Sequence, residues 1–202
     1  DQTSIPARRL APGSDAAAVI VATLPPVDPN VAGSGMYTAK LSGVNNGTGI
    51  GLMEVYDLDD PLTTTSQLAN LSTRGFVGTN DNVLIGGYIS GPGTDDGKVL
   101  ARAIGPSLTN ADVPGALQDP TLELFDGNGN SIAFNDNWQD TAGDEILATG
   151  LAPTQDAESA ILTSQVAGNY TFIVRGINNT TGIGLVEAYH LPNTPVAAPS
   201  HH

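Results

Sequence analysis

The densest group of side chains that could do chemistry lies in the stretch "FDGNGNSIAFNDNWQD", which runs from Phe125 to Asp140, and in the acidic residues after it. Carboxylate and amide oxygens gathered in loops suit Ca²⁺, which takes six to eight oxygen ligands in a flexible shell. The same residue types also form Asx turns and solvated loops, so the sequence leaves both interpretations open. The residues from which we expect a calcium site are Asn135, Asp136, Asn137, Asp140, Asp156 and Glu158.

The segment "DGNGN" at the start of this stretch imitates one type of calcium loop. Asp126, Asn128 and Asn130 alternate as they do in a helix-loop-helix site. The sixth position is Ser131 where that loop needs Gly, and the twelfth is Asn137 where it needs Glu. The segment therefore predicts a hairpin turn, with Gly and Asn at the positive-φ positions between the strands "TLELF" and "SIAFN".

Catalytic signatures are missing from the sequence. Histidine occurs only as His190, His201 and His202, so a Ser-His-Asp triad would have to use His190. There is no HExxH, GxSxG or phosphate-loop motif, and "GTGIGL" continues as a strand where a nucleotide loop needs a helix. We therefore expect a protein that is not an enzyme.

The composition excludes other classes of function. The chain has seven Lys and Arg and 21 Asp and Glu, so its net charge is -14. This charge disfavours nucleic-acid binding because phosphate would be repelled. There is no cysteine, and no apolar run approaches the roughly 20 residues that a membrane helix needs. We expect neither disulfides nor membrane insertion.

Two further features are predicted to be structural. Glu54 and Glu187 each interrupt an otherwise apolar strand, which indicates an edge-facing residue or an ion pair with Arg102 or Arg175. Trp138 stands alone in a polar loop, and a lid over the sandwich is favoured over a platform for a sugar ring.

A repeat organises the chain. "NNGTGIGLMEVYDL" from Asn45 returns as "NNTTGIGLVEAYHL" from Asn178, and "LAPGSDAAAVIVATL" from Leu10 corresponds to "LAPTQDAESAILTSQ" from Leu151. "MYTAKLSG" likewise matches "NYTFIVRG". Ala17 stands where the second copy has Glu158, so a calcium site would be weaker or missing in the first copy.

These patterns predict an all-β protein, a jelly-roll-like antiparallel β-sandwich with an additional half-repeat of strands. "NVLIGGYIS" and "KVLARAIG" are typical of strands, and "TAGDEILATG" indicates one short helix. The predicted domains are an extended tail (1–9), a partial repeat that we call the rear half (10–60), a linker (61–67), a complete unit (68–191) and a Pro-rich tail (192–202). The first residue is not Met, which fits a processed chain or a fragment of a longer one.

The residues from Asp119 to Gly176 resemble a known family. "DPTLELFDGNGNSIAFNDNW" followed by "ESAILTSQVAGNYTFIVRG" is similar to the bacterial pre-peptidase C-terminal domain, a secreted jelly-roll sandwich attached to exported enzymes. The resemblance implies calcium bound by acidic loop residues, here Asp136, Asp140 and Asp156. The flanks "LANLSTRGFVG" and "VLARAIGPSL" look like a tandem repeat of exported environmental-bacterial proteins, which implies a bacterial extracellular or cell-surface location.

The rear half is the feature that points to function. About 50 residues with three strands bury too little surface to be stable alone. Its cover could come from an upstream half, from the complete unit, or from a neighbouring copy, which would give a head-to-tail polymer. We expect an extracellular structural protein, the subunit of a fibre or surface layer stabilised by calcium, with copies of itself and extracellular polysaccharide as partners. The alternative is a calcium-binding module that recognises carbohydrate or protein within a larger secreted enzyme or adhesin.

Overall fold

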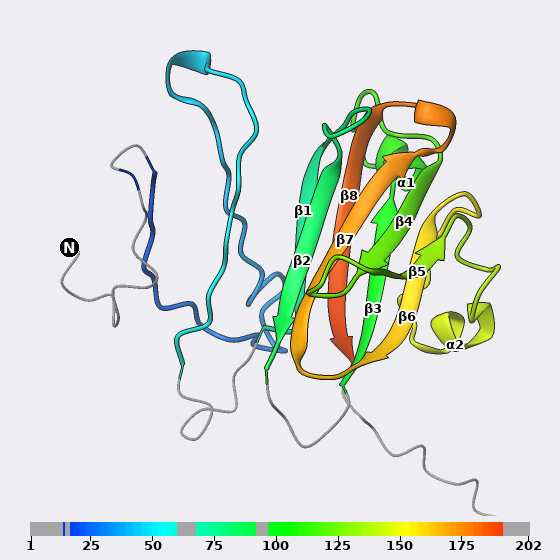
Figure 1. The fold of residues 1–202 in the computed structure, drawn as a ribbon. Coiled ribbons are helices and arrows are strands. Elements are labelled where there is room, and N and C mark those ends of the chain that lie inside the picture. Colours follow the sequence, from blue (N-terminus) through cyan, green and yellow to red (C-terminus); the bar gives the residue numbers. More distant parts are fainter. Residues whose placement is uncertain (1–13, 15–16, 60–67, 92–96, 192–202) are drawn as a thin grey trace, which may run out of the picture. The chain divides into compact units, whose positions relative to one another are not determined.

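The computed structural model describes residues 14, 17–59, 68–91 and 97–191 (Figure 1). The chain divides into two compact units, Asp1–Gln67 and Leu68–His202. The predicted tails and linker fall almost entirely outside the described residues.

The second unit is built from two four-stranded antiparallel sheets, as the all-β prediction requires (Figure 1). One sheet, which we call sheet A, has the strand order β1-β8-β3-β6, and the other, sheet B, has the order β2-β7-β4-β5. The strands are β1 (Asn70–Val77), β2 (Leu84–Ser90), β3 (Gly97–Ile104), β4 (Pro120–Phe125), β5 (Ser131–Asn135), β6 (Ser159–Gln165), β7 (Gly168–Gly176) and β8 (Gly182–Leu191). The β-sandwich prediction is thus confirmed.

The main core lies between the two sheets and follows from the alternation of apolar residues along the strands. On β7, Tyr170, Phe172 and Val174 are buried while the residues between them are more accessible. Tyr88 of β2 stacks on Tyr170 and Phe172, with ring centroids 5.2 and 5.6 Å apart. The period of two in the sequence therefore identifies the inward face correctly.

The outer face of sheet A is covered by two segments of the same unit. Helix α2 (Gly143–Ala148), which the sequence predicted, places Ile146 in a cluster with Leu100. Helix α1 (Pro106–Asn110) was not predicted, and its Leu108 packs on Ile104. The Pro at its first position explains the helix start, because that position needs no N–H donor.

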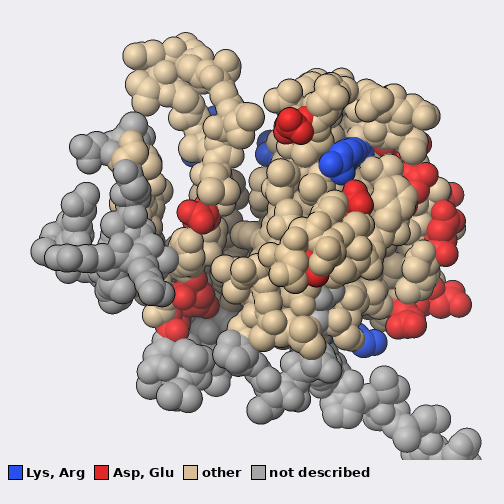
Figure 2. Space-filling model, viewed as in Figure 1, with Lys and Arg blue, Asp and Glu red and all other residues tan. Residues whose placement is uncertain are grey.

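The outer face of sheet B carries apolar side chains that remain exposed, among them Ile85 and Ile89 of β2 and Ile132 and Phe134 of β5. Figure 2 shows acidic side chains gathered on the side of this unit where β5 and α2 lie. Nowhere in the ranges that the structure covers is there a helix with the length and apolar character of a membrane span.

The first unit keeps one local element of the repeat. The 3-10 helix η2 (Val44–Asn46) matches η3 (Ile177–Asn179) of the second unit, and each has a left-handed Asn at its centre. These residues are Asn45 at φ 54° and Asn178 at φ 53°. The turn forms in both copies because its hydrogen bonds are local, Gly47 N to Val44 O and Thr180 N to Ile177 O, both 3.0 Å.

The strands predicted on either side of the first turn are not formed: residues 17–59 contain no strand. Their counterparts show why this expectation was wrong. β6 pairs with β3, β7 pairs with β2 and β4, and β8 pairs with β1 and β3. All these partners belong to β1–β5, which we call the front part of the unit. Residues 17–59 repeat only the segments that follow the front part, so within these residues there is no ladder for them to join.

Candidate functional site

The predicted ligand loop lies where β4 begins and β5 ends, and hydrogen bonds join it to β6. The Asn135 side chain accepts the N–H of Ala160 at 2.9 Å and donates to the carbonyl of Asn137 at 2.9 Å. Ser159 Oγ lies 2.6 Å from the carbonyl oxygen of Asp136. Because both the oxygen and the nitrogen of its amide bond within the protein, Asn135 links the end of β5 to β6.

Two carboxylates at this end each have one oxygen without a hydrogen-bond partner. Oδ1 of Asp119 and Oδ1 of Asp136 are both buried without a hydrogen bond. Burial, and the negative charge of Asp136, raise the pKa of Asp119. A cation between the two side chains would remove this repulsion, so the pair fits Ca²⁺, with backbone carbonyls and water needed to complete its shell.

Sequence reasoning missed Asp119, although the signal was present. The hairpin pairs Leu122 with Asn135 in an antiparallel register. In such a register the residues just before β4 lie beside those just after β5, which brings Asp119 next to Asp136. The hairpin prediction itself is confirmed: Asp126 N donates to Asn130 O at 3.0 Å, and hydrogen bonds from Asn130 lower the pKa of Asp126.

The other loop acids take part in local contacts. Asn137 Nδ2 donates to Asp140 at 3.3 Å, and Gln139 Nε2 donates to Asp156 at 3.1 Å. In the described ranges, no three His, Cys, Asp or Glu side chains are grouped so that they could hold a metal ion. The predicted ligand set stays a prediction, and Asp136 with its unpredicted neighbour Asp119 is the pair with free buried oxygens.

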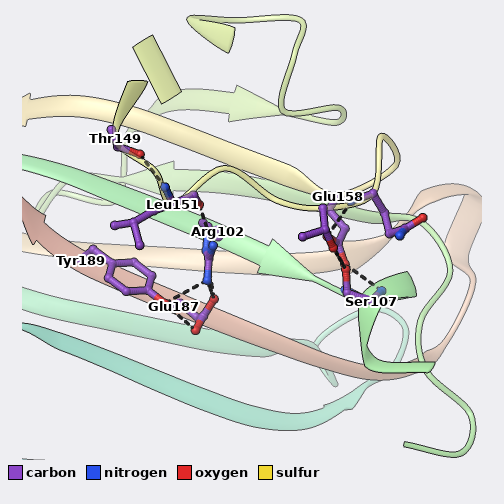
Figure 3. Close-up of polar contacts among 10 residues, drawn as sticks. Arg102, Ser107, Thr149, Leu151, Glu158, Glu187 and Tyr189 are labelled. Carbon is purple, nitrogen blue, oxygen red and sulfur yellow. Dashed lines mark hydrogen bonds and ion pairs between the residues drawn. The ribbon is translucent and has the colours of Figure 1, made fainter. Parts of the chain in front are cut away.

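Glu158 holds a different position from the one expected of a calcium ligand. It is 0% exposed, and its Oε1 accepts the N–H groups of Gly105 at 3.2 Å and Ser107 at 3.0 Å. Its Oε2 accepts the Ser107 hydroxyl at 2.8 Å and the Gln155 N–H at 3.3 Å (Figure 3). All four donors belong to the protein, so Glu158 fixes the start of α1 against the loop before β6.

The predicted ion pair of Glu187 with Arg102 is present on the outer face of sheet A (Figure 3). Arg102 Nε donates to Glu187 at 3.0 Å, and Nη1 donates to the carbonyl of Leu151 at 2.6 Å. The Tyr189 hydroxyl donates to Glu187 at 2.9 Å, and its pKa is raised by burial and by that carboxylate. Arg175, the other candidate partner, pairs with Glu123 at 3.4 Å.

Glu54, the counterpart of Glu187, keeps only part of this arrangement. The Tyr56 hydroxyl donates to Glu54 at 3.0 Å, as Tyr189 does to Glu187. No ion pair joins Glu54 to another residue that the structure describes. The first copy thus presents an exposed carboxylate where the second copy has a satisfied one.

Trp138 is 8% exposed and packs in the cluster of Leu100, Ile146 and Ala160. It borders a hollow of about 340 Å³ that Gln139 and Leu147 also line. A ring covered to this degree serves as a lid on sheet A and offers little face for stacking on a sugar. His190 lies exposed near the end of β8, in keeping with a surface position.

No protein-family model matches the chain, and no curated protein matches it in sequence. Function must therefore be inferred from the contacts within each unit.

Proposed function

We propose that this chain is the subunit of an extracellular fibre or surface layer, in which β-sandwich units associate head to tail and calcium stabilises the complete unit. The supporting observation is the rear half. Its segments repeat the sequences of β6, β7 and β8, yet residues 17–59 contain no strand. Ile50 and Leu52 are 91% and 80% exposed.

The exposed side chains indicate how strongly the rear half favours a partner. Ile20 is 85% exposed, whereas its counterpart Ile161 is 7% exposed within the sandwich core. Burying one such side chain contributes about 1.5–3 kcal/mol. Several residues of this kind, together with unpaired backbone groups, provide enough driving force for association.

The numbers of front and rear parts limit the form of the assembly. Within residues 1–202, the front part is already completed by β6, β7 and β8, and the rear half is left over. Copies of these residues therefore offer no vacant front part. Association must use the free edges and faces of the complete sandwich, and contact between two different surfaces of one chain produces an open polymer.

Light scattering over a wide concentration range, with electron microscopy of the same samples, tests the assembly. We expect the mass to grow with concentration and filaments or sheets to appear. The double variant Ile50→Asn with Leu52→Asn should reduce the growth. Leu147→Asn is the matched control, because it removes an exposed apolar side chain from helix α2, away from the sheet edges. A wild-type chain that remains monomeric throughout refutes the proposal.

The calcium part rests on the unpartnered oxygens of Asp119 and Asp136. We expect Ca²⁺ to raise the melting temperature of the wild type relative to EDTA and Asp136→Asn to remove this rise. Asp156→Asn is the control, because Asp156 is exposed and bonded to Gln139. If calorimetry detects no heat of Ca²⁺ binding to the wild type, the calcium part of the proposal is contradicted and the assembly part is unaffected. The buried position of Trp138 gives no support to the alternative of a glycan-binding module.

A further inference from the structure

One side of the complete sandwich is open. Among the described residues β1 pairs with β8 alone and β2 with β7 alone, so both strands have a free edge on this side. Leu71 and Thr73 belong to the inward set of β1 that ends at buried Val77, yet both are exposed. Opposite Leu71 and Thr73, strand β2 of the other sheet has Gly86 and Gly87, which have no side chains. A narrow slot therefore remains between the two sheets.

On the opposite side of the sandwich β6 and β5 are also edge strands, but hydrogen bonds link the two sheets at one end. There, Asn135 at the end of β5 accepts the N–H of Ala160 on β6, and Ser159 bonds to the carbonyl of Asp136. No side-chain hydrogen bond joins β1 to β2 among the residues that the structure describes. The β1 side is therefore the one where an added strand meets least obstruction.

The outward set of β1 carries the recognition elements. Phe76 is 62% exposed, and Arg74, two residues before it on the same face, is also exposed. Arg74 makes no ion pair within the described part of the chain. A strand that lies along this edge would meet one cation and one large apolar side chain.

Residues 49–58 of the rear half supply the complementary pattern. Their sequence is that of β8, in which Val186 and Ala188 pack in the core and Glu187 faces outward. By this correspondence Met53 and Val55 form the inward set, whereas Leu52 and Glu54 form the outward set. Glu54 is the acid whose counterpart Glu187 pairs with Arg102, whereas Glu54 forms no ion pair with a residue that the structure describes.

We propose that residues 49–58 of a second copy add as an antiparallel strand to the free edge of β1, with Glu54 opposite Arg74. This inference rests on the proposed head-to-tail assembly and identifies its contact. The register follows from the charge pair: Leu52 lies opposite Phe76, and Val55 lies opposite Thr73 above the slot at Gly86. Sheet A thereby continues from one molecule into the next.

Charge reversal of the full chain tests the contact, with assembly followed by light scattering. Glu54→Arg alone and Arg74→Glu alone each place like charges opposite one another, and we expect each to raise the concentration needed for assembly about tenfold. An equal mixture of the two single variants should assemble as the wild type does, because every contact in an alternating polymer joins opposite charges. The double variant should also assemble.

Asp144→Arg is the matched control, since it changes the net charge as Glu54→Arg does but lies on α2. Unchanged melting temperatures exclude misfolding as the cause of a loss. If the wild type assembles and both single variants assemble equally well, this contact is wrong and the head-to-tail assembly stands. If the double variant assembles and the mixture does not, residues 49–58 pair with β1 of their own chain, which overturns the inference. A wild type that does not assemble refutes the proposed function itself.

Discussion

Replacing Glu158 by Gln tests whether this buried carboxylate serves the fold or a metal. The wild-type side chain accepts four hydrogen bonds, from Gly105 N, Ser107 N, Ser107 Oγ and Gln155 N, at 2.8 to 3.3 Å. Gln keeps the size of the side chain but replaces one acceptor oxygen with a donor. Two of the four bonds are then lost, and hydrogen bonds to charged groups contribute about 1.5–3 kcal/mol each. We expect a loss of about 3–5 kcal/mol in the free energy of unfolding.

Urea unfolding followed by tryptophan fluorescence provides the measurement. Trp138 is the only tryptophan of the chain and packs against Ala160, close to Glu158. At about 3–4 °C per kcal/mol for a unit of this size, the melting temperature should fall by roughly 9–20 °C. Glu145→Gln is the control, because its ion pair with Lys98 is solvent-exposed and 3.8 Å long, and such pairs contribute about 0–1 kcal/mol.

The experiment distinguishes the two roles when it is repeated with Ca²⁺ and with EDTA. All four bonds of Glu158 are made to protein donors, so the loss should be the same in both buffers. A loss that occurs only with Ca²⁺, or one below about 1 kcal/mol, would refute the reasoning and restore Glu158 as a metal ligand.

Three further predictions concern the same unit. Arg102→Met and Glu187→Gln should each destabilise it by about 3–5 kcal/mol; the double variant should lose clearly less than the sum, and additive losses in urea unfolding contradict a coupled pair. Asp119 has a raised pKa in the folded state, so its contribution to stability is present at low pH and is lost as the pH rises through that value. In calcium-free buffer Asp119→Asn should therefore raise the melting temperature at pH 7 and leave it unchanged near pH 3. An equal shift of the melting temperature at both pH values would contradict this prediction. Gly176→Ala places Cβ 2.2 Å from Thr180 O and should cost about 1–3 kcal/mol, whereas Gly43→Ala, the same change in the rear half, should leave the Trp138 transition unchanged.

The sequence predicted what depends on local pattern and on the repeat. The period-two strands, the "DGNGN" hairpin and the Glu187 to Arg102 pair were all found where they were expected. Helix α1 was missed because five residues are too few to show a helical period.

The site was predicted less well, because its contacts join distant parts of the chain. Glu158 is grouped with Asp156 in the sequence, but its partners Gly105 and Ser107 lie 53 and 51 residues away. Acidic residues that are neighbours in a loop need not point into the same space. Asp119 shows the converse, since only the register of β4 with β5 brings it beside Asp136.

Comparison of the two copies of the repeat shows which features form from local sequence alone and which features also need partner strands. Both copies form the same left-handed Asn turn, at φ 54° and 53°, because its hydrogen bonds lie within a few residues. Only the second copy forms strands, since a ladder requires partners that local sequence does not provide. The first copy therefore retains the apolar pattern of β8 without the pairing that would bury it. We propose assembly because the chain contains such a segment and also a sandwich in which the outer edge of β1 has no partner strand among the described residues.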